Sequence, residues 1–198
     1  HIHELTEHLV RCIESDLSEF PASFLRGLRL ALNISARQIT DSRLEALLNP
    51  LFERIRAVGW RPEIEITETH LMNLSRQCLD RLAEFCEQGV VVAIDDFGTG
   101  YSSLAYLHTL PVQVLKIDRQ FTQRLGGESR DSRIVSAILA IADALELEVV
   151  AEGIENAEQH AKLRELKCQR GQGYLMARPA PWRVWSANLI DHSQEKSK

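Results

Sequence analysis

Asp95 and Asp96 stand side by side at the end of a short apolar run, residues 91–94, and a glycine-rich turn at 97–103 follows them. Such an apolar run predicts a strand that is buried on both faces. Neighbouring carboxylates repel each other unless a cation lies beside them. A divalent metal held by oxygen ligands explains the pair, and an ordinary strand followed by a solvated turn is the competing interpretation. The pair alone does not decide between the two.

Polar side chains also end the other predicted strands. The strands are predicted at 28–34, 63–67, 90–95, 112–117, 147–151 and, weakly, 169–174. The polar residues at or just after their ends are, in chain order, Asn33, Glu65, Glu68, Asp95, Asp96, Lys116, Asp118, Glu152, Glu155 and Gln172. Because the C-terminal ends of parallel strands meet on one face, we expect these side chains to converge there.

The segments between the strands predict helices. They span 3–18, 41–58, 71–88, 102–108, 130–145, 156–167 and 181–190. In the first helix, Leu5, Leu9, Ile13 and Leu17 form one apolar face with Val10. Strands that alternate with helices indicate parallel βαβ units, either in an open doubly wound sheet or in a (β/α)8 barrel. No dinucleotide-binding glycine motif or P-loop follows a predicted strand, and the polar strand ends favour the barrel.

The candidate metal ligands share one chemical property, because each of them offers oxygen and none offers imidazole or thiolate. They are Asn33, Glu65, Asp95, Asp96 and Glu152. Such a set favours Mg²⁺ or Mn²⁺ over zinc. Two such ions about 3.5–4 Å apart clamp the attacking and leaving oxygens of a phosphoryl displacement. Asp95 is then suited to bridge the two ions, and Asp96 to bind the second.

Lys116 is the cation in this group of strand ends. It can hydrogen-bond the attacking water, act as a base if its pKa is depressed, or stabilise negative charge on the phosphate. It can equally be a structural counter-ion for the carboxylates, and these roles are compatible with one another.

The composition limits the class of protein. The chain has 198 residues and a net charge of −5, which argues against DNA or RNA binding. The four cysteines show no C-x-x-C spacing, so we expect reduced thiols rather than disulfides, and the histidines show no zinc-binding spacing. No apolar run approaches the roughly 20 residues of a membrane helix. We therefore expect a cytoplasmic protein.

The motifs resemble, in order and over residues 3–180, those of the EAL-domain cyclic di-GMP phosphodiesterases. They are Asn33-Ile34-Ser35, Glu65-Ile66-Thr67-Glu68, the stretch 95–104, Leu115-Lys116-Ile117-Asp118, the stretch 151–155, and Gln172-Gly173-Tyr174. The resemblance implies a TIM-like (β/α)8 barrel. It also implies hydrolysis of cyclic di-GMP to the linear 5′-phosphorylated dinucleotide with two Mg²⁺ or Mn²⁺ ions.

The resemblance further implies roles for single residues. The expected metal ligands are Asn33, Glu65, Asp95, Asp96 and Glu152, and the expected catalytic residues are Lys116, which activates water, and Glu152. The expected substrate-binding residues are Gln172, Ser35, Asp118, Arg178 and Pro179, the last at a guanine. The expected loop-anchoring residues are Glu68, Gly98, Thr99 and Gly100. In the family this loop couples dimerisation to the metal site, so a homodimer is expected on the resemblance alone.

One departure concerns the Glu-Ala-Leu triplet that names the family, whose glutamate is a metal ligand at the end of an early strand. Here Glu45-Ala46-Leu47 follows Asn33 and falls inside the predicted helix 41–58, so we interpret it as an ordinary helix segment. We therefore expect the true motif to lie upstream of His1. Residues 1–190 are then an N-terminally truncated domain with six of the eight barrel strands, followed by a disordered tail at 191–198.

These expectations leave several functions open. The intact parent is expected to be an active phosphodiesterase, with an attached sensory or membrane domain left open, and this fragment to be weak or inactive. A non-catalytic cyclic di-GMP receptor is the main alternative, and a metal-dependent barrel enzyme for another phosphodiester is a third. Because receptors of this family usually lose the acidic residues, which are retained here, the enzyme is favoured.

Overall fold

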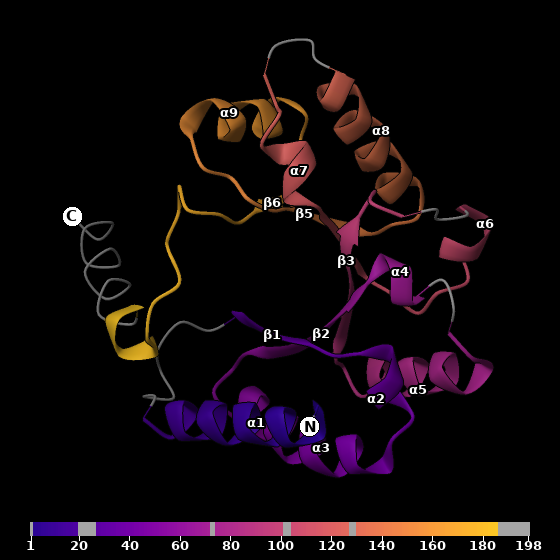
Figure 1. The fold of residues 1–198 in the computed structure, drawn as a ribbon, viewed down its shortest axis with the longest axis vertical. Helices are drawn as coiled ribbons and strands as arrows, with labels where there is room; N and C mark the ends of the chain where they lie inside the picture. Colours follow the sequence, from indigo (N-terminus) through magenta and orange to yellow (C-terminus); the bar gives the residue numbers. More distant parts are fainter. Residues whose placement is uncertain (1, 20–26, 72–73, 101–103, 127–129, 186–198) are drawn as a thin grey trace.

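The structure is a computed structural model that describes residues 2–19, 27–71, 74–100, 104–126 and 130–185. Six parallel strands form a curved sheet in the order β1-β2-β3-β4-β5-β6, with helices along its outer side (Figure 1). The elements are α1 (Ile2–Ser18), β1 (Arg29–Asn33), α2 (Ala36–Ile39), α3 (Ser42–Ala57), β2 (Arg61–Thr67), α4 (Glu68–Leu71), α5 (Arg76–Glu87), β3 (Val91–Phe97), α6 (Leu104–Leu107), β4 (Val114–Ile117), α7 (Arg119–Thr122), α8 (Arg130–Ala144), β5 (Glu148–Ala151), α9 (Ala157–Glu165) and β6 (Arg170–Gly171).

The predicted parallel βαβ arrangement is confirmed, since the sheet is a half-barrel of six parallel strands. Within the described residues β1 and β6 are its two edge strands, and Figure 1 shows them on opposite sides of the open part of the half-barrel. The register aligns Asn33 with Glu65 and Thr67 with Asp95. The predicted strand ends therefore lie at one end of the sheet.

The apolar core lies between the sheet and the helices. Leu48, Phe52 and Phe85 from α3 and α5 are buried, and the two phenylalanine rings meet edge to face at 6.0 Å between centroids. Ile64 and Ile66 of β2 are buried in the same cluster. Because successive strand residues point to opposite faces, Glu63 and Glu65, which alternate with these isoleucines, face the inside of the half-barrel. Charged side chains therefore lie on the inner face of the curved sheet, and the apolar core lies between its outer face and the helices.

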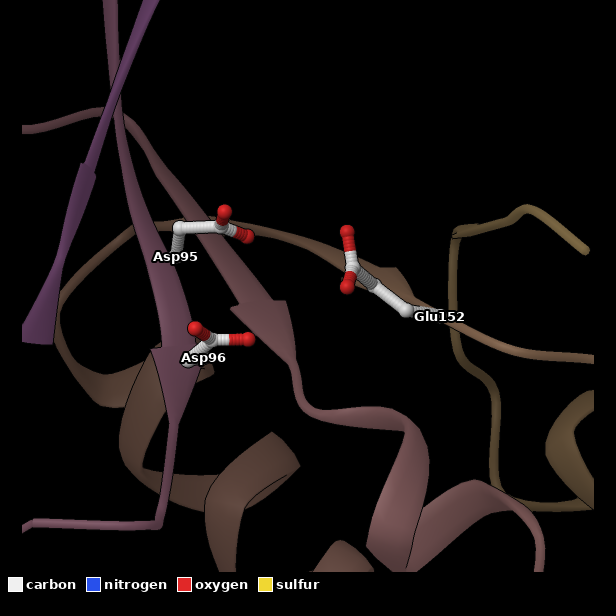
Figure 2. A group of neighbouring side chains, drawn as sticks. All are labelled: Asp95, Asp96 and Glu152. Atoms are coloured by element: carbon white, nitrogen blue, oxygen red, sulfur yellow. The ribbon is translucent and has the colours of Figure 1, made fainter. Parts of the chain in front are cut away.

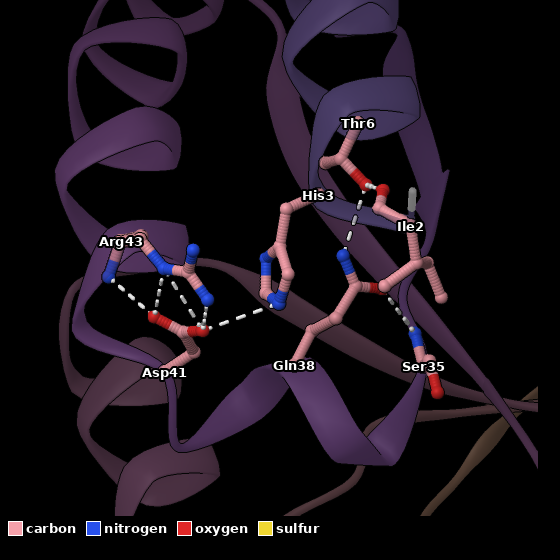
Figure 3. Close-up of polar contacts among 7 residues, drawn as sticks. All are labelled: Ile2, His3, Thr6, Ser35, Gln38, Asp41 and Arg43. Atoms are coloured by element: carbon pink, nitrogen blue, oxygen red, sulfur yellow. Dashed lines mark hydrogen bonds and ion pairs between the residues drawn. The ribbon is translucent and has the colours of Figure 1, made fainter.

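Polar contacts connect α1 to the segment between β1 and α3 (Figure 3). The side chain of Gln38 donates to Thr6 Oγ1 at 2.9 Å and accepts from the Ser35 N–H at 3.2 Å. His3 Nε2 lies 3.2 Å from Asp41 Oδ2, and Asp41 caps the N-terminus of α3. These contacts join residues of α1 to positions more than thirty residues later in the chain.

The predicted apolar face of α1 is only partly buried. Val10 and Leu17 are in the core, but Leu5 is 68% and Leu9 45% exposed. The predicted helix is confirmed, and part of its apolar face is exposed. Periodicity places these leucines on one side of the helix, but it does not determine how much of that side other residues cover.

Other elements also differ from the predictions. Of the helix predicted at 71–88, α5 covers Arg76–Glu87 and begins where Ser75 accepts a hydrogen bond from the Cys78 N–H, whereas the short helix α4 ends at Leu71 and was not predicted. The one-turn helices α2 and α7 were not predicted, and the sixth strand has only two residues. Glu45-Ala46-Leu47 lies within α3, which confirms its interpretation as helix.

Some predictions reach beyond the described residues. Residues 182–185 are helical and residue 181 is not, whereas residues 186–190 of the predicted helix and the predicted tail 191–198 lie outside the described part, as does the predicted helix start at Ser102. The four cysteines carry free thiols, as predicted. Among the described helices, none is both long and apolar enough to cross a membrane.

Candidate metal and substrate site

Three carboxylates from β3 and the end of β5 meet at the C-terminal end of the sheet. The register between β3 and β4 shifts between Ile94 and Phe97, and Asp96 takes a φ of +55°. In a regular strand Asp95 and Asp96 would point to opposite faces, so this irregularity lets both side chains turn toward Glu152 (Figure 2). One ligand oxygen from each carboxylate lies within 4.8 Å of the others.

The electrostatics of this acidic cluster suit a cation. Burial, the charge of Asp95 and a hydrogen bond with Asp118 raise the pKa of Asp96 to about 6. Burial also raises the pKa of Glu152, against the effect of Lys116. Crowded ligands that are all carboxylate oxygens fit Mg²⁺ or Mn²⁺, whereas zinc sites are built mainly from nitrogen and sulfur.

Lys116 lies at the centre of the charged interior and is only 4% exposed. Its Nζ is 2.7 Å from Glu65 Oε1, 2.9 Å from Asp95 Oδ1 and 2.7 Å from Glu152 Oε1. Burial by itself would lower the pKa of Lys116, but the hydrogen bonds and charges of Glu152 and Glu65 outweigh it and raise the pKa. With these partners the ammonium stays protonated, and the depressed pKa that a general base needs is absent.

Glu65 is connected to the acidic cluster through its contact with Lys116. It is buried on β2, and burial raises its pKa while the hydrogen bond from Lys116 opposes the shift. Among the described residues, the close carboxylate cluster contains Asp95, Asp96 and Glu152 without Glu65. Lys116 therefore connects the predicted ligand on β2 to the predicted ligands on β3 and after β5.

Glu68 holds the turn that follows Asp96. Its Oε2 accepts hydrogen bonds from the N–H groups of Gly98 at 2.9 Å and Gly100 at 3.0 Å. Gly98 has a φ of +98°, and a Cβ on Gly100 would lie 3.1 Å from Glu68 Oε1, so glycine suits both positions. Thr99 Oγ1 donates to the carbonyl of Asp96 at 2.9 Å. These bonds fix the backbone directly after the acidic cluster.

Two cavities contain most of the remaining predicted residues, and Asp118 lines neither of them. The first, of about 490 Å³, is lined by Glu152, Gln172, Arg178 and Pro179, and Gln172 Nε2 donates to Glu152 Oε1 at 2.7 Å. The second, of about 380 Å³, is lined by Asn33, Ser35 and Glu65 together with apolar residues of α1. Asp118 caps α7 by accepting from the Gln120 N–H at 2.8 Å. The structure thus distributes the predicted residues over two cavities on either side of Lys116.

Arg119 also lines the first cavity, and the sequence analysis missed it. Gly153 packs closely against Arg119. It has a φ of +69°, and a Cβ at this position would lie 2.5 Å from Arg119 Cβ, so the absence of a side chain leaves room for the arginine. Arg119 follows Asp118 by one position and begins a one-turn helix, so it is not a strand-end residue. Its positive charge beside a strand end was the available signal.

A parallel half-barrel with carboxylates and a lysine at the C-terminal strand ends defines a TIM-barrel-type domain with a candidate oxygen-ligand metal site. Residues 1–179 match the family model described as the EAL domain. The chain therefore belongs to the EAL-domain, cyclic di-GMP phosphodiesterase family.

Three relatives show the extent of the similarity. The cyclic di-GMP phosphodiesterase NbdA of Pseudomonas aeruginosa is 40% identical over 180 residues, which cover 91% of this chain and 23% of NbdA. The EAL domain of DcpA from Mycobacterium smegmatis superposes with a TM-score of 0.71 at 37% identity, covering 82% of this chain and 73% of that one. The manganese and cyclic di-GMP complex of BlrP1 from Klebsiella pneumoniae superposes with a TM-score of 0.72 at 26% identity, covering 90% and 44%. The chain thus spans less than a quarter of NbdA.

Proposed function

We propose that this chain is a phosphodiesterase domain that hydrolyses cyclic di-GMP to linear 5′-phosphoguanylyl-guanosine in bacterial second-messenger signalling. The observation that carries the proposal is the convergence of Asp95, Asp96 and Glu152 within 4.8 Å, beside the buried Lys116. Similarity to NbdA and to the BlrP1 complex supports the substrate and the metal.

The residues proposed to hold two divalent ions are Asn33, Glu65, Asp95, Asp96 and Glu152. When bound, Mg²⁺ or Mn²⁺ supplies the positive charge that activates the attacking water and neutralises the phosphate. Lys116 keeps its proton and directs its N–H groups toward the oxygens on which negative charge develops. We assign it this role because its Nζ lies within 2.9 Å of Glu65, Asp95 and Glu152, at the centre of the proposed ligand set.

The first cavity supplies groups for the dinucleotide. Gln172 is held by Glu152 and presents an amide to water and phosphate. Arg119 and Arg178 line the same cavity and suit phosphate oxygens, since guanidinium groups bind phosphate through paired hydrogen bonds. Pro179 offers an apolar surface to a guanine. Ser35 and Asp118 are proposed as further substrate contacts.

The turn at 98–100 is proposed to transmit changes at a dimer surface to Asp96. Glu68 links the start of α4 to this turn, and the turn begins two residues after Asp96. A displacement of α4 would therefore shift the backbone that carries a proposed metal ligand. A homodimer is part of this proposal.

The test is turnover of cyclic di-GMP by the purified chain in Mn²⁺, with cyclic di-AMP and linear dinucleotide as competing substrates. We expect cleavage of cyclic di-GMP alone, at the weak level anticipated for this fragment, and its loss in Lys116→Ala with Mn²⁺ binding retained. Binding of cyclic di-GMP in Ca²⁺ with no detectable cleavage in Mn²⁺, even at high chain concentration, would favour a receptor instead. Full activity of Lys116→Ala would refute the role given to the lysine.

A further inference from the structure

A second layer of ion pairs lies inside the half-barrel, below the acidic cluster. Arg29 Nη1 is 3.2 Å from Glu63 Oε2, and Arg29 Nη2 is 2.5 Å from Glu148 Oε2. Arg170 Nε contacts the other oxygen of Glu148. The side chains of Arg29 and Glu63 are 15% and 6% exposed. We call Arg29, Glu63, Glu148 and Arg170 the basal layer.

The basal layer stands directly beneath the proposed ligands on the same strands. Arg29 precedes Asn33 by four residues on β1, Glu63 precedes Glu65 by two on β2, and Glu148 precedes Glu152 by four. Residues at even spacing along a strand face the same side, and each residue rises about 3.3 Å. The basal layer therefore lies roughly 7–13 Å below the proposed ligands and faces the same interior.

Arg29 connects two parts of the sheet that share no backbone ladder. It belongs to β1, which pairs only with β2 among the described strands, and it reaches Glu148 of β5. The sheet order places three strands between β1 and β5. Two described sets of ion pairs cross the interior from β1 and β2 to β5 and the residue after it. One is formed by Lys116, which contacts Glu65 and Glu152, and the other is the contact of Arg29 with Glu148.

Lys116 and Arg29 differ in the residues with which they form ion pairs. Lys116 contacts Glu65, Asp95 and Glu152 themselves, so its ion pairs must weaken when those carboxylates bind a metal. Arg29 contacts no proposed ligand, so its ion pairs persist in the loaded site. A buried arginine that bridges two carboxylates forms charge-assisted hydrogen bonds, and its removal takes the described ion-pair partner from Glu63 and leaves Glu148 with Arg170.

We propose that Arg29 is a positioning residue that sets the separation of the metal ligands on the two sides of the half-barrel. The inference rests on the proposed function, because it takes Glu65 and Glu152 to bind the same metal centre. Without Arg29, the ion-paired connection that joins β1 and Glu63 to Glu148 is lost, so β2 and β5 are no longer held at a fixed separation at their base. The ligands above them then no longer reach one centre.

The experiment measures Mn²⁺ binding to the full chain by electron paramagnetic resonance of free Mn²⁺, with thermal unfolding recorded in parallel. Arg29→Met should raise the Mn²⁺ dissociation constant at least about tenfold, as loss of a group that orients metal ligands does. The matched control is Arg76→Met, which removes an exposed pair with Asp80 on α5 and should change the constant less than about twofold. Arg29→Lys keeps the charge and should recover most of the affinity.

A further variant addresses loss of folding. Should Arg29→Met unfold, the triple variant R29M/E63Q/E148Q also removes the two carboxylate charges that Arg29 pairs, and it should fold while still binding Mn²⁺ more weakly by about tenfold. A folded Arg29→Met or triple variant with parental Mn²⁺ affinity overturns the positioning role. A parent chain that binds no Mn²⁺ refutes the proposed function instead, so the two failures are distinguishable.

Discussion

Replacing Lys116 by Met should make the stability of this chain depend strongly on divalent metal. The substitution leaves Glu65, Asp95 and Glu152 buried without their shared cation. Breaking a buried ion pair by removing one partner costs about 3–5 kcal/mol, and protonation of the carboxyls favours the lower end. A loss of about 3 kcal/mol lowers the melting temperature of a chain of this size by about 6–12 °C.

Metal should reverse most of this loss. Mn²⁺ brings positive charge to the same carboxylates, so it should raise the melting temperature of Lys116→Met more than that of the parent chain. Lys162→Met is the matched control, because it removes a single ion pair with the exposed Glu165 on α9 and should leave both melting temperatures within about 2 °C of the parent values. Differential scanning fluorimetry in EDTA and in Mn²⁺ measures all three proteins.

The pH dependence supplies an independent check. Burial already raises the pKa of Glu65 and Glu152 from the ordinary value of 4.5, and loss of Lys116 should raise both further. A carboxyl with a raised folded-state pKa favours folding when protonated, so its contribution is lost as the pH rises through that pKa. Metal-free Lys116→Met should therefore lose stability relative to the parent from about pH 4.5 upward. Equal stability of Lys116→Met and the parent at neutral pH, or an equal rise of their melting temperatures in Mn²⁺, would contradict this prediction.

Three further predictions concern the groups around this lysine. Asp96→Asn should weaken Mn²⁺ binding at least about tenfold by calorimetry while leaving the melting temperature equal or higher, because the repulsion from the neighbouring aspartate falls; a parental affinity would remove Asp96 from the ligand set. Glu68→Gln weakens the acceptor for residues 98–100 and should cost about 1–2 kcal/mol by denaturant unfolding, with faster amide exchange in that turn; unchanged exchange contradicts its anchoring role. Gly153→Ala combines a positive φ with a clash against Arg119 and should cost about 1–2 kcal/mol while raising the KM for cyclic di-GMP more than it lowers kcat; an unchanged KM would separate Arg119 from substrate binding.

The sequence by itself determined the parallel α/β class and the type of chemistry. Short apolar runs that alternate with amphipathic segments specify βαβ units, because burial on each face follows directly from local periodicity. The same runs end in Asp95, Asp96 and Glu152, and parallel strands bring their C-terminal ends together. Oxygen-only ligands then indicate a hard divalent cation. Each of these steps depends on residues that are close in the chain.

The tertiary structure alone decided how the charges are paired. The irregular register after Ile94 turns both aspartates to one side, and the pairing of Lys116 with three carboxylates keeps its pKa high. The contact of Arg29 with Glu148 joins residues 119 positions apart. Periodicity specifies the face on which a side chain lies, but the distance across a half-barrel follows from the curvature of the sheet. Local sequence therefore predicts which groups face the interior, and only the folded sheet determines which of them meet.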